Sequence, residues 1–81
     1  MNDDKLKSCF SQTFGIPEAS VSDELAYNSI KQWDSIGHMA LIASLETAFD
    51  IMLDTDDILA LSSVGKAREI LSKYGVQFGA S

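Results

Sequence analysis

Residues 32–39, QWDSIGHM, place a serine and a histidine three positions apart where an apolar helical pattern begins. On a helix Ser35 and His38 would be neighbours, because side chains three apart share a face. Such a pair could form a hydrolytic dyad, but that chemistry also needs an acid that orients the histidine and an oxyanion hole in a walled pocket. The sequence offers neither. We therefore expect His38 to be a half-buried structural histidine, and we expect no catalytic residues.

The Ser35 hydroxyl has two other possible roles. An Asp-Ser pair before a helix is typical of an N-cap, in which a side-chain oxygen accepts a hydrogen bond from the first turn. Alternatively, the free N–H groups and the positive dipole end of a helix favour a phosphate attached at this point. A phosphodiester-linked prosthetic group would suit an exposed Ser35 beside a mobile loop. The local sequence leaves both roles open.

Metal chemistry has little support in the sequence. Residues 54–57, DTDD, resemble the opening of a calcium loop, but loop positions six and twelve hold Leu59 and Gly65 where glycine and glutamate are needed. One cysteine and one histidine are too few for a structural zinc site. Cys9 lies on the apolar face of a predicted helix, so we expect a core cysteine in a reducing compartment.

Four helices are predicted to position these residues, at about 3–14, 35–49, 55–61 and 63–74. Gly15 and the proline two residues later end the first helix. Asp54 or Thr55 caps the third helix, and Ser63 caps the last, which Gly75 ends. We expect the tail, residues 76–81, to fray.

Residues 18–33 show no sustained periodicity and form a long connection for a compact domain. We expect a helical turn near residues 22–25 and apolar side chains that pin the connection to the helices, namely Leu25, Tyr27, Ile30 and Trp33. The whole chain, residues 1–81, is therefore predicted to be a single all-α domain. Its architecture is a four-helix bundle of three main helices and one short helix, with a long first loop. No apolar run reaches the length of a signal core or a membrane span, so we expect a cytoplasmic protein without membrane insertion.

The helix at 35–49 has two apolar sides. At about 100° per residue, one side gathers Leu41, Ile42, Leu45, Ala48 and Phe49, which we assign to the core. The opposite side carries a second apolar strip, flanked by Glu46 and Thr47 and made of Ile36, Met39, Ala40 and Ala43. This strip is either covered by the first helix or the long loop, or it is a docking surface for a partner. The pattern alone leaves these alternatives open.

The segment DSIGHMALIASLETAFDIML, residues 34–53, resembles the phosphopantetheine attachment region of acyl carrier proteins. The shared pattern is Asp-Ser-Leu, hydrophobic residues spaced through a helix, Leu-Glu, Phe and a hydrophobic pair. It is matched by Asp34, Ser35, Ile36, Met39, Leu41, Ile42, Leu45, Glu46, Phe49, Ile51 and Leu53. The resemblance extends to the first helix, the long loop and residues 62–71. Housekeeping fatty-acid carriers usually have an acidic residue where Gly37 and His38 follow, so a dedicated carrier of a secondary or polymer pathway is favoured.

The resemblance implies that a phosphopantetheinyl transferase attaches 4'-phosphopantetheine from coenzyme A to Ser35. The thiol of this group would carry acyl chains as thioesters to acyl-loading, acyl-processing or acyl-transfer enzymes of fatty-acid, polyketide or related lipid and secondary-metabolite biosynthesis. The protein itself would be a non-catalytic carrier. Two alternatives remain: an aminoacyl or peptidyl carrier, and a cofactor-free helical interaction module.

The distribution of charge indicates the kind of partner. The net charge is −6, and residues 18–57 hold nine acids and one base. Such a chain repels nucleic acid and anionic membranes and attracts basic protein surfaces, so we expect protein partners, no nucleic acid and a monomeric carrier. We assign docking to Asp34, Ile36, Met39, Ala43 and Glu46. Because Glu46 is expected on the exposed flank of the strip, replacing it should leave the melting temperature nearly unchanged.

Overall fold

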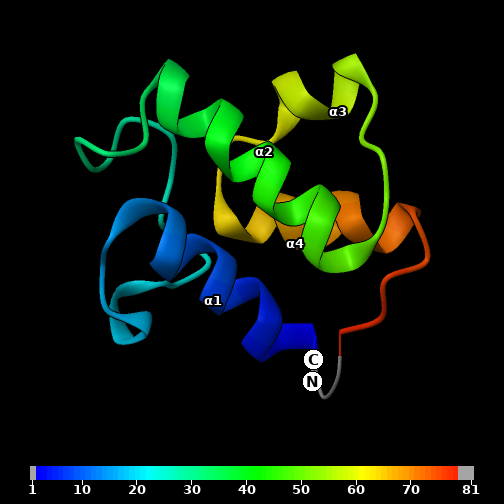
Figure 1. The fold of residues 1–81 in the computed structure, drawn as a ribbon, viewed down its shortest axis with the longest axis horizontal. Helices are drawn as coiled ribbons and strands as arrows, with labels where there is room; N and C mark the ends of the chain where they lie inside the picture. Colours follow the sequence, from blue (N-terminus) through cyan, green and yellow to red (C-terminus); the bar gives the residue numbers. More distant parts are fainter. Residues whose placement is uncertain (1, 79–81) are drawn as a thin grey trace.

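The structure is a computed structural model that describes residues 2–78. These residues form four α-helices and one 3-10 turn, in the order α1 (Asn2–Phe14), η1 (Glu18–Ser20), α2 (Ser35–Phe49), α3 (Thr55–Ala60) and α4 (Val64–Lys73) (Figure 1). Within the described range the only β-type pairing is an isolated bridge between Ala26 and Ser63. The predicted all-α fold with a short third helix is confirmed. None of the helices in residues 2–78 is long and apolar enough to cross a membrane.

The helices begin and end at the residues that local chemistry favours. Gly15 follows α1 with a φ of 65°, a left-handed conformation that suits glycine. The Asp54 carboxylate accepts a hydrogen bond from Asp57 N at 2.9 Å, and so Asp54 is the cap of α3. Ser63 Oγ accepts from Lys66 N at 3.0 Å and caps α4, as predicted.

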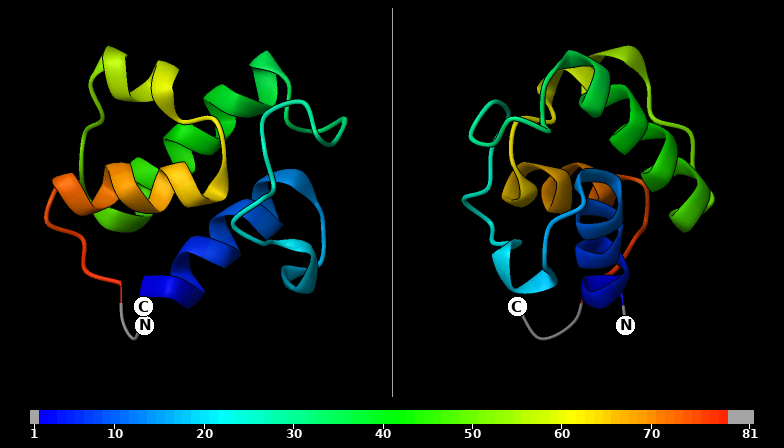
Figure 2. Two further views of the ribbon diagram at one scale, coloured as in Figure 1. Left: turned by 180° about the vertical axis from the view of Figure 1, so that it is seen from behind. Right: turned by 60° about the vertical axis from the view of Figure 1, so that its left-hand side comes forward.

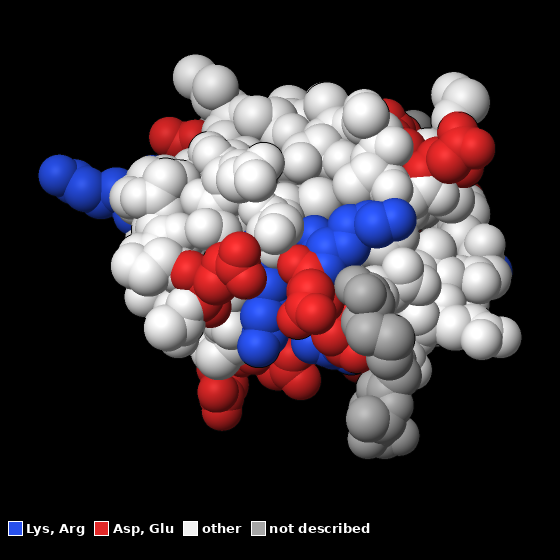
Figure 3. All heavy atoms as spheres, turned by 60° about the horizontal axis from the view of Figure 1, so that its bottom comes forward, with Lys and Arg blue, Asp and Glu red and all other residues white. Residues whose placement is uncertain are grey.

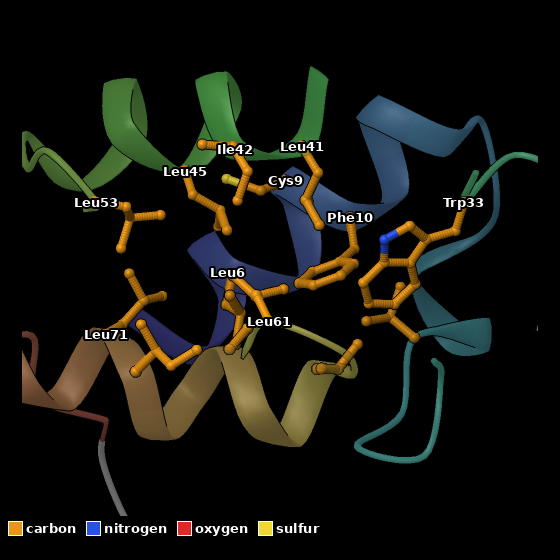
Figure 4. Packing of buried hydrophobic residues seen from close by; sticks show 14 of the residues in the cluster. Leu6, Cys9, Phe10, Trp33, Leu41, Ile42, Leu45, Leu53, Leu61 and Leu71 are labelled. Carbon is orange, nitrogen blue, oxygen red and sulfur yellow. The ribbon is translucent and has the colours of Figure 1, made fainter. Parts of the chain in front are cut away.

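One apolar core joins the three long helices. Figure 4 shows Leu41 of α2 pointing toward Phe10 of α1 and Leu45 pointing into the middle of the cluster, with Trp33 of the first connection at its end. Each fully buried side chain of this size contributes about 1.5–3 kcal/mol to folding. Cys9 is buried in this core as a free thiol, and its burial raises the pKa of the thiol. The prediction of a core cysteine is therefore confirmed.

The long connection between α1 and α2 is tied to the beginning of α4. Tyr27 N donates to the Ser62 carbonyl and Val64 N donates to the Leu25 carbonyl, each at 2.9 Å. Figure 2 shows the connection running from the end of α1 past the beginning of α4 to the beginning of α2. The expected helical turn at 22–25 is a single hydrogen-bonded turn, and the 3-10 turn lies earlier, at η1. Of the expected pins, Trp33 is fully buried.

Residues 76–78, the beginning of the tail that was expected to fray, contact the helices. Asn2 Nδ2 donates to the Gln77 carbonyl at 2.7 Å, and the Phe78 ring lies 6.2 Å from that of Phe49. Arg68 lies over the Phe78 ring and also pairs with Asp3. On the face at the bottom of Figure 1, acidic and basic side chains lie next to one another (Figure 3). The rest of the expected tail, residues 79–81, lies outside the described residues.

Candidate functional site

The first turn of α2 is capped by Asp34 and not by Ser35. Asp34 has an extended backbone, and its Oδ1 accepts a hydrogen bond from Gly37 N at 2.8 Å. Ser35 is therefore the first helical residue, and its side chain is exposed with no hydrogen-bond partner among residues 2–78. The N–H groups of Ser35 and Ile36 have no partner within the helix either, because the first turn of any helix lacks them. The interpretation of Ser35 as the N-cap is wrong, and its hydroxyl is available for chemistry.

Gly37 lets the preceding connection approach the first turn of α2. A Cβ on residue 37 would clash with the Gln32 carbonyl oxygen and would lie 3.3 Å from a carbon of the Phe14 ring. No other residue fits without displacing the backbone of the connection. This close approach explains the glycine after the Asp-Ser pair, for which the sequence offered no reason.

His38 is held between the connection and α3. Trp33 Nε1 donates to His38 Nδ1 at 2.9 Å, and His38 Nε2 lies 2.8 Å from the Ile58 carbonyl. An indole nitrogen can only donate and a carbonyl can only accept, so the proton must lie on Nε2, which donates to Ile58. Both ring nitrogens are engaged in these contacts, and the ring is half-buried as predicted. No imidazole nitrogen is left to act as a base on Ser35.

A pocket of about 400 Å³ opens beside Ser35 between α2 and α3. It is lined by Tyr27, Ser35, His38, Met39, Ile58, Leu59, Leu61 and Ser62. The lining is mostly apolar, and the volume falls within the range of roughly 300–1,000 Å³ typical of small-molecule sites. Within residues 2–78 no cluster of His, Cys, Asp and Glu side chains could hold a metal ion. The geometry therefore suits an apolar group near the Ser35 hydroxyl.

The two faces of α2 have different environments. Leu41, Ile42 and Leu45 are buried, whereas Ile36 is 81% and Met39 is 57% exposed. Ala40 and Ala43 are exposed as well, so neither α1 nor the connection covers the second apolar strip.

Leu59 of α3 also belongs to this site, although it was not predicted from the sequence: it is 78% exposed and lines the same pocket. A usable signal was present in the run ILAL, residues 58–61. Four consecutive apolar residues cannot all lie on the buried side of such a short helix. The structure buries Leu61 and leaves Leu59 exposed. The exposed apolar surface near Ser35 thus extends from α2 onto α3.

Not every acid of α2 and α3 is a free surface charge. Glu46 is half-buried, and its Oε2 accepts a hydrogen bond from Leu53 N at 3.0 Å. The expectation of an exposed Glu46 is therefore wrong, and the hydrogen bond to Leu53 N leads us to expect a loss of stability when Glu46 is replaced. Its carboxylate holds the chain that leaves α2.

Asp57 is a second acid with a structural role. Only 6% of it is exposed, and it lies 2.7 Å from Lys73 Nζ and accepts from the Tyr74 hydroxyl at 2.6 Å. The hydrogen bonds from Lys73 and then Tyr74 hold the pKa of the Asp57 carboxyl below its usual range. The same contacts raise the pKa of Lys73 and of Tyr74, in each case chiefly through the bond to Asp57. This network joins α3 to the end of α4.

Comparison with known proteins agrees with this arrangement. The family model described as "Phosphopantetheine attachment site" matches residues 4–71, which include all of α2 and its first turn. The acyl carrier protein of Desulforapulum autotrophicum is 41% identical over 58 residues, covering 72% of this chain and 68% of that protein. Proteins of this kind bear a covalently attached phosphopantetheine. The chain therefore belongs to the phosphopantetheine-binding family of acyl carrier proteins.

Proposed function

We propose that the protein carries acyl groups as thioesters on a 4'-phosphopantetheine attached to Ser35. The observation that supports this most directly is the exposed Ser35 hydroxyl, which has no partner in residues 2–78 and opens onto an apolar pocket. The group fits the residues present, because N–H groups of the first turn and the helix dipole favour a phosphate beside Ser35. The matched family segment includes this residue.

The residues of the chain act as an acceptor and not as a catalyst. Ser35 Oγ forms a bond to the phosphorus that bears the pantetheine of coenzyme A, while the bond from that phosphorus to 3',5'-ADP breaks. The hydroxyl proton passes to a base that the phosphopantetheinyl transferase must supply, since both nitrogens of His38 are engaged elsewhere. Once attached, the group supplies a thiol on which acyl chains are held.

The partners are a phosphopantetheinyl transferase and enzymes that load, process or transfer acyl groups, in fatty-acid, polyketide or related biosynthesis. Ile36, Met39 and Ala43 offer them an apolar surface, and Asp34 and Glu46 add negative charge. The chain has no Lys or Arg between Lys31 and Lys66, so the segment that holds α2 and α3 should attract basic partners. A cytoplasmic, monomeric carrier fits this role.

The apolar pocket favours acyl cargo over aminoacyl cargo. A charged amino group placed in it would lose hydration without gaining a carboxylate, because no acidic side chain lines the pocket. We therefore assign the chain to acyl groups and treat aminoacyl loading as an outcome that a loading experiment can detect.

The test is the intact mass after incubation with coenzyme A and a broad-specificity phosphopantetheinyl transferase. We expect the wild-type protein to gain one phosphopantetheine and Ser35→Ala to gain none. Ser63→Ala is the matched control, because it removes a helix-capping serine that should play no part in loading. Modification of Ser35→Ala at another serine would contradict the assignment. Failure of several transferases to modify the wild type would favour the cofactor-free interaction module.

A further inference from the structure

We infer that His38 is a positioning residue that holds α3 against α2, fixes the inner wall of the pocket beside Ser35 and restricts the cargo held there to short acyl groups. This inference rests on the proposed function, since the cargo is borne on Ser35. It rests on the hydrogen bond from His38 Nε2 to the Ile58 carbonyl of α3 and on the position of the His38 ring between the pocket and the core.

The short helix α3 packs only Ile58 against the apolar core, so its polar contacts carry much of its attachment. Of its six residues only Asp57 is buried, while Ile58 is half-buried and Leu59 is exposed. The Asp57 network ties α3 to α4. In residues 2–78 the hydrogen bond between His38 Nε2 and the Ile58 carbonyl is the one that ties α3 to α2. The separation of α2 and α3, and with it the width of the pocket, therefore depends on His38.

The ring of His38 also separates the pocket from the core. It stacks on Trp33 at an interplanar angle of 14°, and Trp33 is fully buried against Phe10 and Phe14. Leu61, which also lines the pocket, is 1% exposed. A chain that enters beside Ser35 meets His38 and Leu61 before it can reach the core. A short acyl group fits in front of them, whereas a long one must displace them or remain in water.

The experiment compares wild type, His38→Ala and His38→Gln, each loaded from acetyl-, hexanoyl- or dodecanoyl-coenzyme A and verified by intact mass. The glutamine amide can accept from Trp33 and donate to Ile58, so it preserves both hydrogen bonds that alanine removes. Cargo that binds only the folded state raises the melting temperature, which is the readout.

For the wild type we expect the dodecanoyl form to melt within about 2 °C of the hexanoyl form, because the longer chain gains no further shelter. For His38→Ala we expect the dodecanoyl form to melt about 4 °C or more above the hexanoyl form, because the inner wall is open. His38→Gln should behave as the wild type. A steady rise with chain length in the wild type, or the same profile in His38→Ala, overturns the inference.

If His38→Ala does not fold, the melting series of the loaded wild type still tests the limit on chain length, and a spectroscopic measurement on the unloaded wild type tests the two hydrogen bonds of His38. Nitrogen NMR should show His38 as the neutral Nε2–H tautomer, with the Trp33 indole N–H in a hydrogen bond. A proton on Nδ1 would overturn the inference. Failure to load Ser35 would instead contradict the proposed function, so the two failures are distinguishable.

Discussion

The N-termini of α2 and α4 are built alike and yet differ in what they leave exposed. Each follows a side-chain cap, Asp34 for α2 and Ser63 for α4. Each has a glycine in its first turn that a carbonyl of the long connection approaches: Gln32 approaches Gly37, and Asp23 approaches Gly65. A glycine in the first turn therefore lets the long connection pack closely against the N-terminus of each helix.

The difference lies in the N–H groups. In α4 the chain itself supplies the acceptors, because Val64 N donates to the Leu25 carbonyl and Gly65 N to the Asp23 carbonyl. In α2 no residue of 2–78 accepts from Ser35 N or Ile36 N, and the Ser35 side chain is exposed. The N–H groups at the beginning of α4 are therefore satisfied within the fold, whereas those at the beginning of α2 remain free to bind an added group.

The largest effect should come from the face of α2 opposite its exposed strip. Leu45→Ala removes a fully buried side chain and should lower the free energy of unfolding by about 2–5 kcal/mol. Met39→Ala, on the exposed strip, should cost less than about 0.5 kcal/mol yet weaken transferase binding. Denaturant unfolding measures the stability of both variants, and the rate of loading by the transferase measures the binding effect of Met39→Ala. Equal large losses would mean that the strip is part of the core and that no docking surface lies there.

The two glycines allow a direct test of the close approaches. Gly37→Ala forces the Gln32 carbonyl to move and should destabilise the protein by about 1–3 kcal/mol. At Gly65 the added Cβ would be 3.3 Å from the Asp23 carbonyl, and the better helix propensity of alanine, about 1 kcal/mol, should offset most of the strain. Urea unfolding of both variants checks the order. A larger loss of stability in Gly65→Ala than in Gly37→Ala would show that the connection packs more tightly against the N-terminus of α4 than against that of α2.

The sequence predicts the helices better than it predicts the contacts of their polar residues. Periodicity identifies the buried face of α2 because that signal lies within fifteen residues. The partner of His38 is 20 residues away and that of Asp57 is 16 residues away, so no local pattern encodes them. The sequence leaves the role of Ser35 open for a related reason. Asp and Ser are both good caps, and only the backbone decides which of two adjacent residues is the last extended one.

The pH dependence of stability should report on the network that joins α3 to α4. Because the pKa of Asp57 is lowered in the folded protein, its contribution is present above the unfolded value of about 4 and is lost as the pH falls through the folded pKa. The raised pKa of Lys73 and of Tyr74 gives a contribution that is present below about pH 10 and is lost above it. Melting temperatures of Asp57→Asn should therefore vary less with pH at both ends than those of the wild type.

The matched control for this experiment is Asp56→Asn, since Asp56 is exposed in the same turn. It should keep the pH profile of the wild type and melt at a higher temperature than Asp57→Asn. If both variants lose the same part of the profile, the general acidity of α3 matters more than the buried contact.

The smallest effect should come from electrostatic steering toward the open end of α2. Asp34, Asp54 and Asp56 are exposed, so attraction to a basic transferase should weaken as salt screens charges beyond roughly 8 Å at physiological ionic strength. Glu46→Lys is a poor probe, because it also removes the bond to Leu53 N, worth about 1 kcal/mol.

Glu46→Gln separates the two roles of this residue, since the amide oxygen can still accept from Leu53 N while the charge is gone. We expect kcat/KM for loading to fall less than about threefold in Glu46→Gln, with a shallower dependence on salt than in the wild type. In Met39→Ala the loss should be the same at every salt concentration, because apolar contact is not screened. A flat salt profile in the wild type, together with unchanged loading of Glu46→Gln, would leave apolar docking beside Ser35 as the whole basis of recognition.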